Sequence, residues 1–388
     1  MVSQAPNLGV VAAPARPPVQ FRREVGEFLL VGGATWLLFP ICWLLERWLG
    51  MDAAIYQMSF IAFYAAFVIN DPHFGVTYLL FYRDVKQRAF GSEYGLAQRI
   101  RYLVGGFVVP VVLLTWAALA LTTPSVRAIG LMVQLMFLLV GWHYVKQGFG
   151  VLTVLSARRG FAFKPLERRV MLAHCYLGWG YAWASPFDPG SLFEEHGVVY
   201  RSLTHPTWLE PLMASLFAAS TVALVGVLGK RLVQREGFPP LTPLIGFLVT
   251  VWLWTIFTSL DPLMAYLIPG LHSLQYLYFV WLLRRNKARA TQRPLGSGMP
   301  VMVQLGLLAL GALLIGWTMF RIGPMVLGEV MPALPKEGGG QVVDDGRRTL
   351  LGATPYAAVL LAMVNIHHYF MDHVIWRREN PETRFLRG

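Results

Sequence analysis

The sequence has few charged residues and only two cysteines, and each shortage argues against a class of protein. Charged residues make up 14% of the 388 positions and apolar residues 55%, whereas an ordinary soluble domain is about 25% charged. Cys42 and Cys175 form no CxxC pair and no CxxCH haem-attachment motif, so neither a disulfide framework nor an iron–sulfur or cysteine-rich zinc site is expected. Long apolar runs fill most of the chain, which is the composition of a polytopic membrane protein.

We predict an all-α, polytopic transmembrane helix bundle of about ten spans. The expected spans cover residues 27–49, 53–81, 103–122, 127–156, 168–187, 207–229, 240–260, 262–283, 300–331 and 350–376. Residues 1–24 are rich in Pro and Ala and show no apolar periodicity, so we expect a disordered cytoplasmic tail there. Residues 25–388 are expected to form a single membrane-embedded helical domain.

The basic residues indicate how the chain is oriented. With the N-terminus inside, 25 of the 33 Lys and Arg residues fall in inner segments and six in outer ones. This asymmetry predicts that both termini face the cytoplasm, and we expect a multi-pass protein of the bacterial inner membrane. The excess of basic over acidic residues (33 against 21) is then charge on cytoplasmic loops, and no nucleic-acid partner is expected. The loops at 188–206 and 332–349 become the outer ones.

The last predicted span carries an unusual concentration of ionisable groups. The stretch NIHHYFMDHVIWRREN places His367, His368, Asp372 and His373 within seven residues. On a helix, His368 and Asp372 share a face with Asn365, while His367 points about 100° away. Ionisable groups are costly inside a bilayer, so this stripe is a functional hypothesis: one wall of a metal site.

Histidines on three other predicted spans lie at a similar depth. The four helices would run parallel, from outside to inside, and counting at about 1.5 Å per residue back from the next arginine puts the four rings within roughly 9 Å in depth. We therefore predict that they converge on one point, with His367 as a further candidate ligand and Asp372 as a ligand or an orienting group. The predicted metal ligands are His73, His143, His272, His367, His368 and Asp372.

Two further residues are candidates for proton delivery, Lys146 and Tyr276. Lys146 would be an ammonium group inside a span, so it needs a counter-charge, for which Asp71 or Asp372 would serve. Taken singly, a buried histidine with polar neighbours is as often an interhelical hydrogen bond as a ligand. His174 is expected to be structural in this sense.

Imidazole together with a carboxylate suits iron, copper, zinc or nickel rather than calcium or magnesium. Iron, as one ion or two, fits best, with copper, zinc and haem as alternatives. An apolar cleft beside the metal would take a lipid or isoprenoid substrate, and a redox partner could approach from the cytoplasm. The prediction is a membrane-embedded, metal-dependent oxidoreductase.

With histidines on several membrane helices near the cytoplasmic side, the chain resembles the integral-membrane histidine-cluster iron enzymes, which include fatty-acid desaturases, lipid hydroxylases and bacterial carotenoid-cleaving dioxygenases. It departs from the desaturases, whose boxes read HxxxH and HxxHH, because here HHYFMDH puts the histidine pair first. The resemblance implies a class of chemistry and assigns no residue.

Two other functions stay open. A haem electron-transfer protein would use facing histidines, such as His143 and His272, as axial ligands. A proton-coupled transporter would use Asp71, Lys146, Asp372 and the histidines as a relay.

Overall fold

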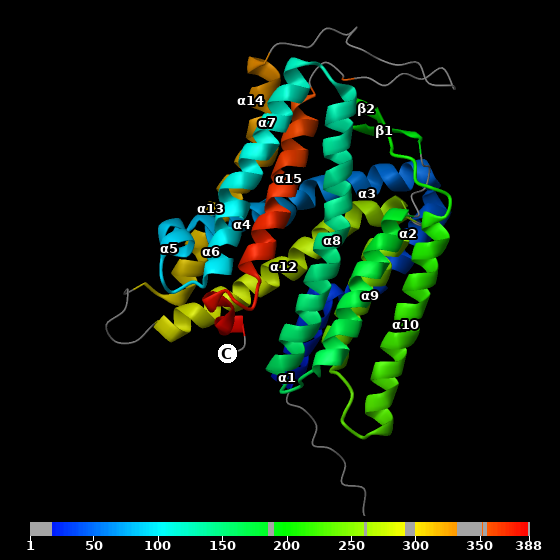
Figure 1. Cartoon of the computed structure of the whole chain (residues 1–388), viewed down its shortest axis with the longest axis vertical. Helices are drawn as coiled ribbons and strands as arrows, with labels where there is room; N and C mark the ends of the chain where they lie inside the picture. The colour runs from blue at the N-terminus through cyan, green and yellow to red at the C-terminus, as the bar shows by residue number, and fades with distance from the viewer. Residues whose placement is uncertain are drawn as a thin grey trace, which may run out of the picture.

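A computed structural model describes residues 18–184, 190–259, 262–291, 299–331, 351 and 355–386 of the chain. The described part is helical apart from one small hairpin, which confirms the all-α class (Figure 1). The predicted outer loop at 332–349 and residues 1–17 of the predicted tail lie outside the described residues. Helix α1 begins at Pro18, within the stretch that the sequence assigned to the tail.

The first half of the chain is a series of helices interrupted by short π-helical turns. The elements are α1 (Pro18–Phe28), η1 (Leu29–Gly33), α2 (Thr35–Leu49), α3 (Met51–Ala66), α4 (Asn70–Tyr82), α5 (Val85–Phe90), α6 (Leu96–Leu103), η2 (Val104–Val108), α7 (Val109–Thr122), α8 (Val126–Arg158) and α9 (Pro165–Ala184).

The second half opens with an antiparallel hairpin, in which Leu192 pairs with Arg201 and Glu195 with Val198. The elements are β1 (Leu192–Glu195), β2 (Val198–Arg201), α10 (Leu209–Val233), α11 (Leu241–Leu248), η3 (Val249–Ile256), η4 (Phe257–Ser259), α12 (Pro262–Thr291), α13 (Val301–Trp317), η5 (Thr318–Ile322), α14 (Gly323–Val330), α15 (Tyr356–Ile375) and η6 (Pro381–Leu386).

Several helices are long and apolar enough to cross a membrane, as expected for a membrane protein. Five meet that description in the described residues, and a sixth is added if the bent pair Arg22–Gly33 and Thr35–Leu49 counts as one span. The predicted number of about ten is therefore not confirmed. Helices α12 and α15 are not among the five. Both carry the polar groups on which the site depends.

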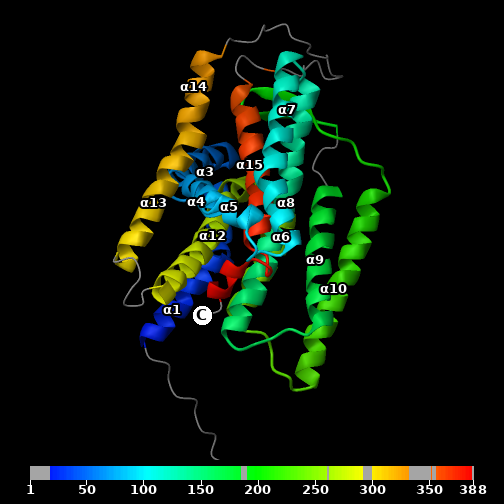
Figure 2. The ribbon, with the colours of Figure 1, turned by 60° about the vertical axis from the view of Figure 1, so that its left-hand side comes forward.

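Several of the connections lie at the two ends of the helix bundle. Figures 1 and 2 show the links α8–α9 and α10–α11 at the lower end, with the C-terminus and the C-terminal end of α12 nearby. The hairpin β1–β2 and the α7–α8 link lie at the upper end. The four histidine-bearing helices are not parallel, however. In both views α12 runs obliquely across α8 and α15, so the rings meet where helices cross rather than at one depth on aligned helices.

Helix α4 is held against α13 by an unusually close backbone contact. A Cβ atom at Gly316 would lie 2.2 Å from the carbonyl oxygen of Asp71, and one at Gly75 would lie 2.1 Å from that of Ala312. Only glycine fits at such a distance, and small residues serve in this way between membrane helices. The contact fixes the backbone of Asp71–Pro72, immediately before His73.

Candidate metal centre

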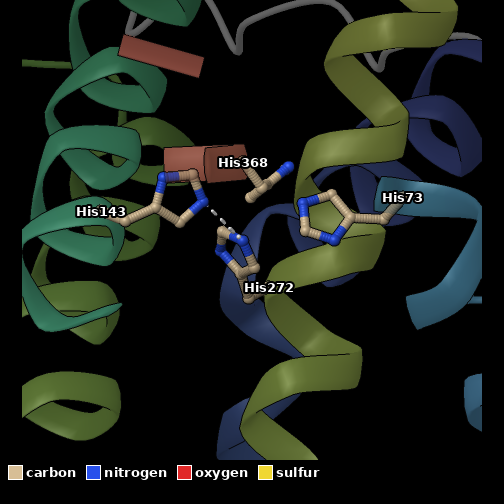
Figure 3. Close-up of side chains that lie close together, drawn as sticks. All are labelled: His73, His143, His272 and His368. Carbon is tan, nitrogen blue, oxygen red and sulfur yellow. Dashed lines mark hydrogen bonds between the residues drawn. The ribbon is translucent and has the colours of Figure 1, made fainter. Parts of the chain in front are cut away.

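Four histidines from four different helices come together in the interior. His73 comes from α4, His143 from α8, His272 from α12 and His368 from α15, and Figure 3 shows their rings turned toward one another. Each offers one ring nitrogen, and these four nitrogens lie within 4.8 Å of one another. Two imidazoles bound to the same ion at about 2.1 Å can be at most about 4.2 Å apart. The four rings therefore need only a small adjustment to share one ion.

Several ring nitrogens of this cluster lack hydrogen-bond partners. Nε2 of His73, Nδ1 of His272 and both nitrogens of His368 are buried and unpaired, as is Oδ2 of Asp372. All five residues of the site are at most 5% exposed. A buried polar atom without a partner costs about 1–3 kcal/mol, so these five atoms are costly to bury unless something else satisfies them.

Residues on α12 and α8 hydrogen-bond to the ring of His73 and to the backbone of His272. The hydroxyl of Ser273 lies 3.2 Å from Nδ1 of His73, while the other nitrogen of that ring faces the cluster without a partner. Gln147 donates to the backbone carbonyl of His272 at 3.2 Å and to the side chain of Gln275 at 2.7 Å. A contact such as that of Ser273 with Nδ1 of His73 fixes the direction of the imidazole ring.

Asp372 links the histidines to a chain of hydroxyl groups. Its Oδ2 lies 3.4 Å from Nε2 of His368 and 3.6 Å from Nε2 of His143. Its Oδ1 accepts a hydrogen bond of 2.8 Å from the hydroxyl of Tyr276, which lies 2.7 Å from that of Thr77. Two sequence candidates, Asp372 and Tyr276, therefore belong to the same network as two of the histidines.

The structure does not bring His367 into the cluster. Its Nδ1 lies 2.9 Å from the hydroxyl of Tyr78, and its Nε2 lies 3.0 Å from the carbonyl oxygen of Gly105. Both ring nitrogens are thus engaged in interhelical hydrogen bonds, as the 100° offset from His368 allows. His174 contacts the hydroxyl of Ser220 at 3.0 Å, in keeping with a structural role.

The expected counter-charges of Lys146 are both used elsewhere. Asp71 accepts a 2.9 Å hydrogen bond from Nε of Arg321, whose guanidinium stacks on the rings of Phe63 and Phe67. Lys146 lies over the ring of Tyr176, with Nζ 5.8 Å from its centroid. Among the described residues it forms no ion pair.

An apolar cavity of about 790 Å³ lies against the cluster. Three of its aromatic lining residues contact the histidines and lie between them and the cavity. The distance between ring centroids is 4.5 Å for Phe74 and His368, 4.5 Å for Tyr144 and His272, and 4.9 Å for Tyr369 and His143. Polar groups along its walls include Asn70, Asp71, Arg321 and Asn365.

A second cavity, of about 430 Å³, approaches from the other side. It reaches His143, Asp372 and Tyr276 directly. Tyr369 lines both cavities and so stands between them. The walls of this second cavity are rich in cationic side chains, including Lys146, Arg168, Arg377 and Arg378.

Sequence reasoning missed several residues of the site. Ser273 follows His272 directly, yet its hydroxyl serves His73 on another helix. Phe74, Tyr144 and Tyr369 are each adjacent in sequence to a cluster histidine, but aromatic residues are common along membrane helices and carried no signal. Their role depends on the crossing of the helices, which no local pattern records.

Comparisons with known proteins add no identification. No family model, no curated protein and no solved structure matches the chain.

Proposed function

We propose that the protein is a membrane-embedded metalloenzyme that oxidises an apolar, lipid-like substrate. Its single metal ion would be held by His73, His143, His272 and His368. The observation that carries the proposal is the convergence of four buried imidazoles with ring nitrogens within 4.8 Å. Several of these nitrogens are unpaired. A metal ion held between the four rings would satisfy the ring nitrogens that face one another.

Iron is the metal that we propose. An all-imidazole set without thiolate suits iron, copper or zinc. A non-haem iron ion with open coordination positions would supply oxygen chemistry when bound, and the adjoining apolar cavity suits a lipid or isoprenoid chain. Haem is disfavoured, because Nε2 of His143 and Nε2 of His272 are 3.0 Å apart. At that separation the two rings are in direct contact, which leaves no space for a macrocycle between them.

The chain's own residues then have distinct tasks. Asp372 lies beside His143 and His368, where it orients these rings or completes the ligand set. Tyr276 holds the other oxygen of that carboxylate and can pass a proton along the hydrogen bond to it,. The wall of Phe74, Tyr144 and Tyr369 positions an apolar chain next to the histidines and keeps water away from it. Lys146, the other sequence candidate for proton delivery, lines the second cavity together with Asp372.

Elemental analysis of protein purified in detergent without chelators tests the proposal. We expect about one iron per chain in the wild type and a loss of most of it in H73A, H143A, H272A and H368A. H174A and H367A are the matched controls: both remove a buried histidine and its hydrogen bonds, and both should retain the metal. An optical spectrum recorded on the same samples separates non-haem iron from haem, which has an intense Soret band.

Wild-type protein without iron, copper or zinc after growth in metal-supplemented medium would overturn the proposal. An equal metal content in H174A and H272A would do so as well. Iron accompanied by a Soret band would turn the assignment to the haem alternative.

A further inference from the structure

The second cavity is more basic than a proton path requires. Its cationic lining consists of Lys146 on α8, Arg168 on α9, and Arg377 and Arg378 after α15; we call this cavity the basic vestibule. Its acidic lining residues are Asp372 and Glu379. Asp372 is already engaged with Tyr276 and the histidines, and Glu379 lies 3.4 Å from Nε of Arg377.

Three of the four cations have no anionic partner in the described part of the chain. Within the described ranges, Lys146, Arg168 and Arg378 form no ion pair, whereas Arg377 contacts both Glu379 and Nε2 of His373. Three unpaired positive charges around one small cavity repel one another. Lys146 is also half-buried, and a cation withdrawn from water without a counter-charge is costly.

Lys146 brings part of this positive charge close to the histidines. It follows His143 by three residues on the same helix, so the two side chains lie on the same face, one turn apart. His143, Asp372 and Tyr276 line the inner part of the vestibule. A ligand held by the cations would therefore reach the side of the cluster opposite the apolar cavity.

We propose that the basic vestibule binds an anion bearing a carboxylate or phosphate group and holds it beside Asp372 and the histidines. Arginine and lysine side chains form charge-assisted hydrogen bonds with the oxygens of such groups. A volume of about 430 Å³ is within the usual range for a small-molecule site. A soluble anionic co-substrate and the headgroup of an acidic lipid present the same chemistry. The two cavities would then admit two different ligands, one apolar and one anionic.

Anion binding does not depend on the metal, so it can be measured on chelator-treated protein. The full chain is placed in nanodiscs made only of phosphatidylcholine, and equilibrium dialysis measures the binding of radiolabelled phosphate and malonate. We expect saturable binding of at least one of them. R168Q and R378Q should each lower the affinity about tenfold, the loss expected when one charge-assisted hydrogen bond is removed. K146Q should have an effect at least as large.

R169Q is the matched control. Arg169 is exposed and adjacent to Arg168 on α9, yet it does not line the vestibule, so its loss should leave the affinity unchanged. Arg168 and Arg169 are both exposed, so neither R168Q nor R169Q should disturb the fold.

A second arm distinguishes the source of the anion. Phosphatidylglycerol is added to the nanodiscs, and native mass spectrometry counts the lipids that stay bound. Retention of phosphatidylglycerol by the wild type and its loss in R168Q or R378Q would support a lipid headgroup as the ligand. Equal binding of every probe by the wild type and by K146Q, R168Q and R378Q would overturn the proposal, as would no saturable binding of any of them. Neither result bears on whether the four histidines hold iron.

Discussion

The Nε2 atoms of His143 and His272 lie 3.0 Å apart, although the two residues are separated by 129 positions in the sequence. At this distance one ring donates its N–H to the other, so at least one lone pair is used by the cluster itself. An ion bound by both rings would replace that hydrogen bond and move the two nitrogens apart. The separation is therefore the part of the site that should change most between metal-free and metal-loaded protein.

Removing the metal should destabilise the protein. A ligand present at about 1,000 times its dissociation constant adds about 4 kcal/mol to the free energy of unfolding, provided that it binds only the folded state. We expect chelation to lower the melting temperature of the wild type, measured by differential scanning fluorimetry in detergent. H272A should melt at one temperature with or without chelator. A wild type that is insensitive to chelation would contradict this expectation.

Replacing Tyr276 by phenylalanine should weaken the Asp372 network. The change removes the 2.8 Å hydrogen bond to Asp372 and the 2.7 Å contact with Thr77, and leaves a buried carboxylate oxygen unpaired. We expect a cost of about 1–3 kcal/mol in the free energy of unfolding and a weaker affinity for the metal.

Y278F is the control for Y276F, because it removes a tyrosine hydroxyl from the same helix that contacts Glu27 instead. A double-mutant cycle of Y276F with T77V should show coupling, since the two hydroxyls share one network. Strict additivity would argue that these hydroxyls act separately.

Enlarging Gly316 should disturb the site without touching any ligand. In G316A the new Cβ would lie 2.2 Å from the backbone carbonyl oxygen of Asp71, so α13 and α4 must separate. Overpacking of this kind costs about 1–3 kcal/mol, and we expect a reduced metal content because His73 follows on the same backbone. G328A is the control, since a Cβ at Gly328 meets no atom within 4 Å. Equal metal content in the two variants would show that the close contact does not position His73.

The C-terminal turn η6 should detach at low pH. Burial by itself would raise the pKa of Glu382, but Arg88, Lys287 and Arg284 together hold the pKa below its usual value of 4.5. Its carboxylate lies 3.2 Å from Nη2 of Arg88 and 2.5 Å from Nζ of Lys287. The folded-state pKa is thus lower than the unfolded one. Its contribution to stability is therefore complete above about pH 4.5 and is lost as the pH falls through the folded-state value.

Hydrogen exchange of residues 381–386 as a function of pH tests this account. We expect protection at neutral pH, a loss of protection in acid, and no such transition in E382Q, which should be less protected already at pH 7. E379Q removes an exposed carboxylate three residues away and should behave like the wild type. A transition of the same size in E382Q would assign it to another group.

The stripe on α15 shows how far local pattern reaches. His368 and Asp372 share a helix face by their spacing alone, and the structure has them 3.4 Å apart. The same spacing placed His367 on another face, where it contacts Tyr78 and Gly105. By contrast, the sequence could not predict that Asp71 pairs with Arg321 instead of Lys146, because Arg321 lies in a distant segment of the chain.

The amino-acid sequence alone determined that the chain is helical and suited to a membrane, because apolar runs and helical periodicity are local properties. It also determined which histidines are costly to bury, since each lies inside such a run. Only the tertiary structure decided that His73, His143, His272 and His368 meet, that His367 does not, and that α12 crosses α8 obliquely. Helix packing depends on contacts such as that between Gly316 of α13 and Asp71 of α4, which join residues far apart in the chain and leave no periodic trace in its sequence.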